Sequence, residues 1–357
     1  MSKKVLAVIG LFLTCCIVFI LKTLRDAGEF KKLRPHFAGI ISRVEGVVGA
    51  EDITIARDKA IAYISSDDRY AAIKGRPAQG GIYGLRLDIA GAEPFLLKRI
   101  PEQEIHPHGI SYYLSPSGEA FLFVVDHTGG RQAILIYQFQ GDSILALKRI
   151  IHHPMLVSPN DITAVDEDKF YCTNDHGSAG KVSKMLEDYL QLQRSHVVYY
   201  DGKQLRVVAK GIGFSNGIQV SKDGKEVYVA ATTEKRVHVY ERGTDGGLTL
   251  KTSIDLHTGV DNIELDYSGN LWIGCHPKLL TFVRHAADTS RQAPSQVIRV
   301  VRHADGSFTS DEVFLNSGNA LSGSSVAAVY KDILLIGPVL ERHFLRCTLP
   351  AKFAEAY

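Results

Sequence analysis

The chain has 357 residues, of which 45% are hydrophobic and 22% are charged, and its formal net charge is +2. This composition is typical of a globular protein with a sizeable core. The near-neutral balance argues against nucleic acid as the main partner, because no basic stripe is available to bind phosphates. Five cysteines are too few for a disulfide-stapled scaffold.

The N-terminal segment does not resemble the rest of the chain. An uncharged run, VLAVIGLFLTCCIVFIL, occupies residues 5–21 and as a helix would extend roughly 25 Å, near the lower limit for crossing a bilayer. A cleaved signal peptide usually has a shorter apolar run and an Ala-x-Ala site, so the sequence favours an uncleaved signal-anchor over a cleaved signal. We predict an anchor at 1–25, a charged stem at 26–42 and a folded domain at 43–357, in the secretory pathway or at the cell surface. Basic residues on both sides of the run leave its orientation open.

From residue 50 onward the sequence repeats itself. Each repeat has small or polar residues before an Ile or Val, then a short strand, a turn and a second apolar strand, as in PNDITAVDEDKFYCTNDH. Six marker residues recur in this way: Ile53, Ile110, Ile162, Ile218, Ile263 and Val326. Third strands are expected in GGIYGLRLD, ILIYQFQ, HVVYY, RVHVYER and LLTFVRH, and fourth strands in PFLLKRI, ALKRIIHH, LRVVAK, LKTSIDL and QVIRVVRH. The pattern predicts an all-β fold, a six-bladed β-propeller, because an irregular β-sandwich does not explain the recurring polar marker.

One segment departs from the strand pattern. KVSKMLEDYLQLQRS, residues 181–195, has apolar residues at helical spacing: Val182, Met185, Leu186, Tyr189 and Leu190. It falls between the second and third strands of its repeat, so the predicted helix would lie across one end of the propeller. It is interpreted either as a cap on that end or as a lid over a site.

Polar residues precede the marker in most of the repeats. Because the innermost strands of a propeller line its central channel, these side chains are expected to converge on the axis: Glu51, Asp52, His108, Asn160, Asp161, Asn216, Asp261 and Asn262. Such a ring cannot stay buried without compensation. All but His108 offer hard oxygen ligands, which suit Ca²⁺ better than Zn²⁺, and the carboxylates can balance two divalent ions. The alternative is that these residues only cap strand ends.

Seven motifs occur in order over residues 43–348: GAEDI, HPHGIS, PNDITAV, YCTNDH, FSNGI, VDNI and LWIGCHP. Together they resemble the motifs of the serum paraoxonase/arylesterase family. The resemblance implies a six-bladed propeller with two calcium ions in its channel. By motif match, the catalytic calcium would be held by Glu51, Asn160, Asn216, Asp261 and Asn262. The deeper, structural calcium would be held by Asp52, Asp161 and the carbonyl of Ile110.

The resemblance also implies an activity, since family members hydrolyse lactones, with aryl esters and some phosphotriesters as side activities. His108 and His127 match the family's histidine dyad, in which His108 would act as general base on water and His127 would tune it. This chemistry is coherent in itself, because calcium polarises a carbonyl and an imidazole titrates near neutral pH. Pocket positions are matched by Tyr70, Asp175, His176 and Phe214. We therefore expect a membrane-anchored, calcium-dependent lactonase and arylesterase that acts on lipophilic lactones or esters.

Other functions remain open. Some paraoxonase-like membrane proteins are accessory factors in the assembly of other membrane proteins, and calcium could be purely structural in such a protein. A gluconolactonase-like propeller enzyme is disfavoured by HPHGIS and GCHP. GFSNG, residues 213–217, satisfies the G-x-S-x-G pattern of serine hydrolases, but a strand and not a helix is expected after it, so Ser215 is not expected to be a nucleophile. Either histidine could instead have a purely structural role.

The cysteines mark a departure from the family pattern. The family joins its N-terminal strand to its last strand by a disulfide; Cys347 matches the C-terminal half, but no cysteine stands near Ile40. We expect this clasp to be absent and Cys347 to be free. The chain also has no Asn-x-Ser/Thr sequon, and both features fit a tethered protein whose propeller faces a reducing compartment. Cys172 and Cys275 are expected to be buried small hydrophobes and not nucleophiles.

Overall fold

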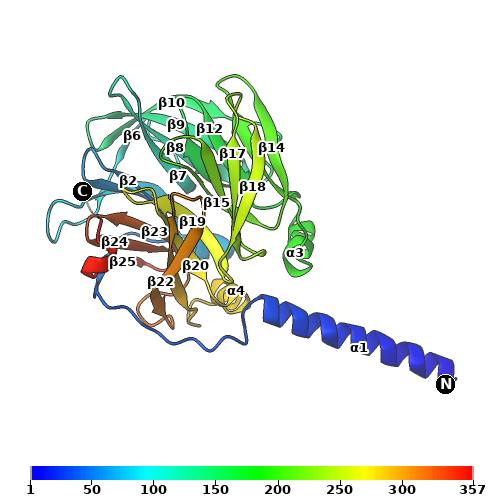
Figure 1. Ribbon diagram of the computed structural model, residues 1–357. Helices are drawn as coiled ribbons and strands as arrows, with labels where there is room; N and C mark the ends of the chain where they lie inside the picture. Colours follow the sequence, from blue (N-terminus) through cyan, green and yellow to red (C-terminus); the bar gives the residue numbers. More distant parts are fainter. Residues whose placement is uncertain (1, 356–357) are drawn as a thin grey trace.

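Six β-sheets surround a central axis in the computed structural model, which describes residues 2–355 (Figure 1). Within these residues, five sheets have four strands and one has five. The innermost strand of each sheet contacts the innermost strand of the next, and the contacts close into a ring. The structure thus confirms the six-bladed propeller predicted from the repeats.

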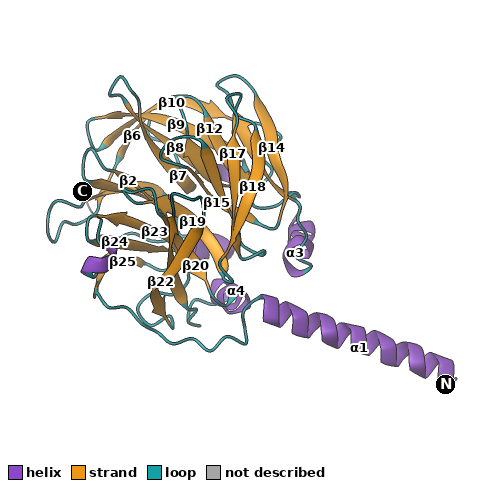
Figure 2. Cartoon of the chain, in the orientation of Figure 1, coloured by secondary structure: helices purple, strands orange, loops and turns teal. Residues whose placement is uncertain are grey.

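Figure 2 shows that strands dominate the chain apart from its first helix. In blades 1 to 6, the innermost strands are β2 (Ala50–Ala56), β7 (Pro107–Leu114), β11 (Pro159–Ala164), β15 (Ser215–Val220), β19 (Gly259–Leu265) and β23 (Ser324–Tyr330). The second strands are β3 (Ile61–Ser66), β8 (Ala120–Asp126), β12 (Phe170–Asn174), β16 (Glu226–Ala231), β20 (Leu271–His276) and β24 (Ile333–Pro338). The third strands are β4 (Gly81–Arg86), β9 (Ala133–Gln140), β13 (Ser195–Tyr200), β17 (Arg236–Arg242), β21 (Ser295–Arg302) and β25 (His343–Thr348). The outer strands are β5 (Phe95–Leu96), β10 (Ile144–Ile151), β14 (Leu205–Ile212), β18 (Leu248–Asp255), β22 (Phe308–Asn316) and β1 (Ile40–Glu45).

A β-bulge interrupts the pairing of the first and second strands in every blade. The register shifts directly before the marker residue, for example between Ala50 and Ile53 in blade 1 and between Pro159 and Ile162 in blade 3. The other four blades shift at the corresponding place. A bulge leaves residues out of the ladder and redirects their side chains. The polar residues before the markers are therefore free of the ladder at the axis of the ring.

Glycine relieves the crowding at this axis in two blades. The residue before the marker is Asp52, Asp161 or Asn262 in blades 1, 3 and 5, but Gly109 or Gly217 in blades 2 and 4. A Cβ on Gly109 would lie 2.4 Å from the Cα of Asp161, and one on Gly217 would lie 2.6 Å from the Cα of Asn262. Side chains and glycines thus alternate from blade 1 to blade 5, and each glycine makes room for the side-chain-bearing residue of the next blade, while blade 6 has Ser325 at this position.

The hydrophobic core is divided among the six interfaces between blades. Each interface has its own cluster of buried side chains drawn from two neighbouring blades. At the interface of blades 5 and 6, for example, fully buried Trp272 and Phe314 pack with Leu334 and Leu345. Because both faces of a blade are covered in this way, the middle strands are nearly continuous apolar runs.

The N-terminal strand β1 closes the ring by pairing with β25 of blade 6. The ladder runs from Ile40 opposite Thr348 to Glu45 opposite His343. Cys347 lies opposite Ile41 and is free, so hydrogen bonds and packing hold this closure. Cys172 and Cys275 are buried and free, as predicted.

The structure differs from the predicted strands in blades 1 and 5. LLTFVRH forms a helix, α4 (Leu279–Ala287), and the third strand of blade 5 is instead β21, which was predicted as the fourth. Leu279, Phe282 and His285 recur every three residues, and His285 is fully buried, which suits a helix packed on the blade. PFLLKRI is divided between β5 of blade 1 and β6 (Lys98–Ile100), which pairs in parallel with β10 of blade 2.

Helices gather at one end of the propeller (Figure 1). The first helix, α1 (Lys3–Asp26), has a mean hydropathy of 2.7 over its most apolar window, none of which is buried, and is long and apolar enough to cross a membrane. The predicted second helix is confirmed as α3 (Lys181–Tyr189). A short helix, α2 (Arg69–Ile73), follows β3, and 3₁₀ turns occupy Thr128–Gly130 and Ala351–Phe353.

The apolar face of α3 points away from the propeller. Its five predicted apolar residues are all exposed, from 46% at Tyr189 to 67% at Val182. The buried residue of the helix is instead Glu187, whose Oε2 accepts a hydrogen bond of 2.9 Å from the Gly177 N–H. The sequence predicted which residues share a face, but the structure places the opposite, polar face inward.

Candidate metal centre and active site

A cluster of buried side-chain oxygens lies at the axis of the propeller. Within the described part of the chain, five oxygens of the predicted ring have no hydrogen-bond partner: Glu51 Oε2, Asn160 Oδ1, Asn216 Oδ1, Asp261 Oδ1 and Asn262 Oδ1. Buried polar atoms nearly always have a partner. A cluster of unpaired oxygens, two from carboxylates and three from carboxamides, has the donor chemistry of a Ca²⁺ site. We call these atoms the five-oxygen site.

The three carboxamides of this site are oriented by hydrogen bonds from their nitrogen atoms. Asn160 Nδ2 donates to Asp175 Oδ2 at 3.4 Å, Asn216 Nδ2 donates to Thr232 Oγ1 at 3.3 Å, and Asn262 Nδ2 donates to Glu51 Oε1 at 3.0 Å. With the nitrogen engaged, each amide is held with its oxygen unpaired. Partners of this kind fix metal-ligating groups in other proteins and raise their affinity for the metal.

Ser325 links the two carboxylates of the site. Ser325 Oγ donates to Glu51 Oε1 at 2.8 Å and lies 3.1 Å from Asp261 Oδ2. Burial and the nearby Glu51 charge raise the pKa of Asp261, although His276 opposes the shift. Among the described residues, no group of three or more His, Cys, Asp or Glu side chains is arranged to hold a metal. Any metal here would therefore depend on the carboxamides as well as the acids.

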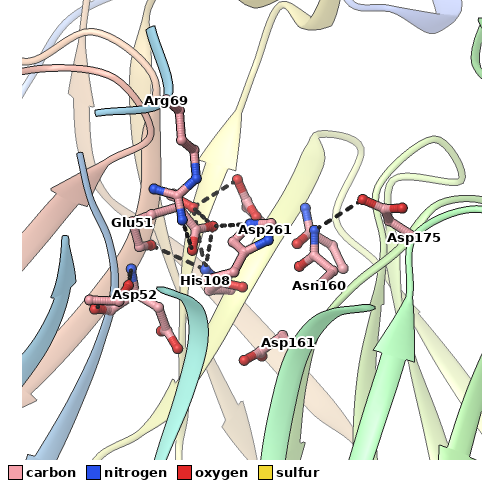
Figure 3. A network of polar contacts seen from close by, with 12 residues as sticks. Glu51, Asp52, Arg69, His108, Asn160, Asp161, Asp175 and Asp261 are labelled. Carbon is pink, nitrogen blue, oxygen red and sulfur yellow. Dashed lines mark hydrogen bonds and ion pairs between the residues drawn. The ribbon is translucent and has the colours of Figure 1, made fainter. Parts of the chain in front are cut away.

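Asp52 and Asp161, the predicted ligands of a deeper calcium, make a different set of contacts. Asp52 accepts hydrogen bonds from the N–H groups of Ile53 and Ile110, and Asp161 accepts them from Ile162 and Ile218. Each carboxylate thus links its own blade to the next. Burial and the Glu51 charge raise the pKa of Asp52 to about 8. Figure 3 shows both residues apart from the Glu51 and Asn160 group; a second calcium at Asp52, Asp161 and Ile110 stays a prediction.

His108 and His127 form the contact that the resemblance implies. His108 Nδ1 lies 3.0 Å from His127 Nε2, and His127 Nδ1 lies 2.5 Å from Gln132 Oε1. Because an amide oxygen only accepts, His127 Nδ1 carries a proton and its Nε2 accepts from His108 Nδ1–H. The remaining nitrogen, His108 Nε2, is 3.5 Å from Glu51 Oε1. The hydrogen-bond chain thus leaves His108 Nε2 available beside the five-oxygen site.

The two neighbours of His108 differ in charge: His127 is neutral and Glu51 is ionised. Burial, followed by the charge of His108, lowers the pKa of His127 to about 3, so His127 is neutral at physiological pH. Burial opposes ionisation of Glu51, but His108 and Arg69 outweigh it and lower the pKa of Glu51 to about 2. Glu51 is therefore a fixed negative charge beside His108 (Figure 3).

A cavity of about 370 Å³ is lined by His108 and by four residues of the five-oxygen site: Glu51, Asn160, Asn216 and Asp261. Its floor includes Glu51, His108 and Asn160, and its walls include residues of α1, α3 and α4. Among the predicted pocket residues, Asp175 and Phe214 line the cavity. His176 lies behind them, with its ring 5.1 Å from that of Phe214. Tyr70 lies on α2 and does not line the cavity, but its neighbour Arg69 does.

The chain is similar to known proteins over most of its length. An arylesterase family model matches residues 29–349. Human serum paraoxonase/arylesterase 1 is 36% identical over 309 residues, which cover 84% of this chain and 86% of the relative. The rat protein of the same name is 34% identical over 350 residues, with 94% and 97% covered. This chain belongs to the serum paraoxonase/arylesterase family.

The paraoxonase-family chain also resembles solved structures at low sequence identity. A luciferin-regenerating enzyme aligns with a TM-score of 0.54 and 11% identity, covering 90% of this chain and 98% of that chain. A putative gluconolactonase aligns with a TM-score of 0.52 and 14% identity, covering 89% and 97%. At such identities the likeness concerns the propeller fold alone.

Several site residues of this paraoxonase-family chain were missed by the sequence analysis. Arg69 Nη2 is 3.8 Å from Glu51 Oε2 and donates to the Pro107 carbonyl at 2.9 Å. His276 Nε2 lies 2.7 Å from Asp261 Oδ2, and the LWIGCHP motif that contains it was a signal for it. Arg69 and Gln132 lie outside the repeated strands, so the in-phase comparison of blades had no means of finding them.

Proposed function

We propose that this paraoxonase-family protein hydrolyses lactones and aryl esters with calcium bound at the five-oxygen site. The observation that carries the proposal is the cluster of unpaired oxygens, because four of the five residues that supply them line the same cavity as His108. Family membership supports an ester hydrolase. Carboxylate and carboxamide oxygens favour calcium over softer metals.

The residues of the cavity divide the work of hydrolysis. Calcium, when bound, would polarise the ester carbonyl and stabilise the negative charge that develops on its oxygen. In its neutral form His108 has its proton on Nδ1, which donates to His127, so its free Nε2 takes a proton from the attacking water. Glu51, 3.5 Å away, stabilises the imidazolium until His108 passes this proton to the leaving oxygen as the ester C–O bond breaks. His127 stays neutral and keeps the proton of His108 on Nδ1, so that Nε2 faces the water.

The cavity walls favour an apolar substrate. Phe214 lies on one side, and Leu279, Leu280, Phe282 and Val283 of α4 lie on another. Burial of apolar surface is worth roughly 25 cal/mol per Å², so an alkyl or aryl group attached to the lactone ring would add to binding. Lipophilic lactones and esters are therefore the substrates that we propose.

The helices beside the cavity suit attachment to a membrane. α1 has an uncharged apolar run over residues 5–21, and the exposed apolar face of α3 adds Met185, Leu186 and the adjoining Leu190 at the same end of the propeller (Figure 1). We propose that α1 anchors the protein while α3 lies in the interfacial layer, so that the cavity opens near the lipid.

In nanodiscs with photoactivatable phospholipids, both helices should be cross-linked. Met185→Ser with Leu186→Ser should reduce labelling of α3 and leave α1 as an internal standard; equal α3 labelling in the variant would contradict this placement.

His108→Gln tests the proposed mechanism directly. Loss of a general base lowers turnover by about 100-fold or more, while bound calcium should stay unchanged because His108 is not among the five-oxygen ligands. Initial rates on a long-alkyl lactone with the full chain would measure this, and exposed His303→Gln is the matched control. Full turnover in His108→Gln would remove that residue from its role.

No turnover in the folded, calcium-loaded parent chain would reject the proposed enzyme function and favour a non-catalytic accessory protein.

A further inference from the structure

The N-terminus of α4 is capped by the segment that follows α1. The first N–H groups of any helix lack partners within the helix, and the N-cap residue Lys278 provides no side-chain bond. Instead, the Leu279 N–H donates to the Ala27 carbonyl at 2.9 Å, and the Thr281 N–H donates to Glu29 Oε1 at 2.9 Å. Two of the unpaired donors of α4 are thus satisfied from a distant part of the chain.

Glu29 holds α4 through more than the backbone. Its other oxygen, Oε2, accepts from Thr281 Oγ1 at 2.8 Å and from Arg284 Nη2 at 2.9 Å. The Glu29 side chain is 10% exposed, which is unusual for an acid in a stem segment. A negative charge at a helix N-terminus is also favourable for the helix dipole. These contacts mark Glu29 as part of the folded domain.

The junction before Glu29 is shaped for this approach. Gly28 has a φ of +75°, and a Cβ at this position would lie 2.3 Å from the Pro277 carbonyl oxygen. Ala27, before this glycine, is buried. Lys31, after it, donates from Nζ to the His257 carbonyl at 2.5 Å. Only a glycine lets the chain pass this close to the loop that begins α4.

The helix that Glu29 holds is a wall of the candidate active site. Leu279, Leu280, Phe282 and Val283 of α4 line the cavity together with Thr23 and Ala27. We call residues 3–31, which are α1 and the residues directly after it, the anchor segment. Phe282 stacks on His276 with ring centroids 4.0 Å apart and planes 25° apart. His276 in turn contacts Asp261 of the five-oxygen site. A contiguous set of contacts therefore links Glu29 to the apolar wall and to the metal ligands.

We propose that Glu29 is a positioning residue for this active site: by capping α4 from the anchor segment, it fixes the apolar wall that receives the substrate's alkyl or aryl group. The inference rests on the proposed hydrolase function. It makes the anchor segment part of the enzyme and not only a tether. Glu29 acts through α4, so its loss weakens substrate binding and leaves the chemical step at His108 intact.

Hydrogen exchange of the full chain in nanodiscs tests the cap without using activity. In Glu29→Ala, amides of the first turn of α4 should exchange about fivefold faster, the effect of losing a helix cap. The exchange rate in Glu29→Gln should lie between those of the parent and of Glu29→Ala. The Gln amide oxygen still accepts from the Thr281 N–H, while the ion pair with Arg284 is lost. Gly28→Ala disturbs the same junction independently and should also loosen α4. Exposed Glu45→Ala is the control and should leave α4 unchanged; unchanged α4 exchange in both Glu29→Ala and Gly28→Ala would overturn the proposal.

Kinetics of the same variants then test the positioning role. Glu29→Ala should raise KM for a long-alkyl γ-lactone by about fivefold with kcat preserved, since uniform binding is what is lost. The effect on unsubstituted γ-butyrolactone should be smaller, and Glu29→Gln should recover part of the KM. A loosened α4 with unchanged KM for the long-alkyl lactone would overturn the proposal. If the parent chain turns over neither lactone while Glu29→Ala still loosens α4, the proposed hydrolase function fails and the cap is supported by exchange alone.

Discussion

Asn216 carries no charge, yet it contributes an unpaired buried oxygen to the five-oxygen site, as Glu51 and Asp261 do. Its Nδ2 is committed to Thr232 and its Oδ1 is unpaired. The repeat pattern predicted Asn216 because it stands directly before a glycine and a marker in phase with the other blades. Arg69, by contrast, reaches Glu51 from α2, and no periodic signal marks a residue outside the repeated strands.

At the residue scale, we predict that Asn216→Ala weakens calcium binding. Removing one of the oxygen donors should raise the Kd for calcium by about 10- to 100-fold, the range found when groups that support a metal are lost. Isothermal titration of the full-length protein would measure this, and exposed Asn319→Ala is the control. Unchanged affinity in Asn216→Ala would remove this amide from the metal centre.

At the scale of elements, α3 is held to the propeller by its polar face. His176 lies with Nδ1 2.6 Å from Asp175 Oδ1 and Nε2 3.0 Å from Asp188 Oδ1 of α3. Lys184 Nζ donates to Ser158 Oγ at 2.6 Å. Burial disfavours the charged form of His176, but its bonds to the two aspartates outweigh burial and raise its pKa to about 9. The imidazolium therefore joins the helix to the blade.

This contact should make stability depend on pH. Because the folded pKa of His176 is raised above its ordinary value, its contribution is fully present below about pH 6.5 and is lost as pH rises through about 9. The difference in Tm between the parent and His176→Asn should be largest near pH 6 and shrink toward pH 10. Thermal melting at several pH values would measure it, with His303→Gln as a control. A difference that stays constant with pH would show that His176 acts through packing and not through charge.

The same elements show where prediction from sequence was limited. Periodicity identified α3, but it does not say which of two faces meets the protein, and here the apolar face is outward. LLTFVRH is short and apolar, and such a segment fits a buried strand or a helix equally well. α4 was misassigned because the strand count of the repeat favoured a strand, while the true third strand lay further along at Ser295–Arg302.

At the scale of the whole molecule, the propeller and its ring of polar side chains were predictable because six blades repeat one pattern. Residues in phase must meet at the axis once the ring closes, which brought Glu51 and Asp261 together across more than half of the chain. The contribution of the anchor segment was not predictable, because Glu29 contacts α4 only through the tertiary fold. Compositional boundaries had placed this residue in a stem.

The most direct test of a catalytic calcium is to remove the metal from the full-length protein with a chelator and then add calcium back, while measuring bound calcium and lactone hydrolysis together. We expect hydrolysis to stop when the five-oxygen site is empty, and to return in proportion to the calcium that this site binds. Asn216→Ala should need correspondingly more calcium to regain the same rate. Undiminished lactone hydrolysis by a folded protein that holds no calcium would contradict the proposed role of the five-oxygen site.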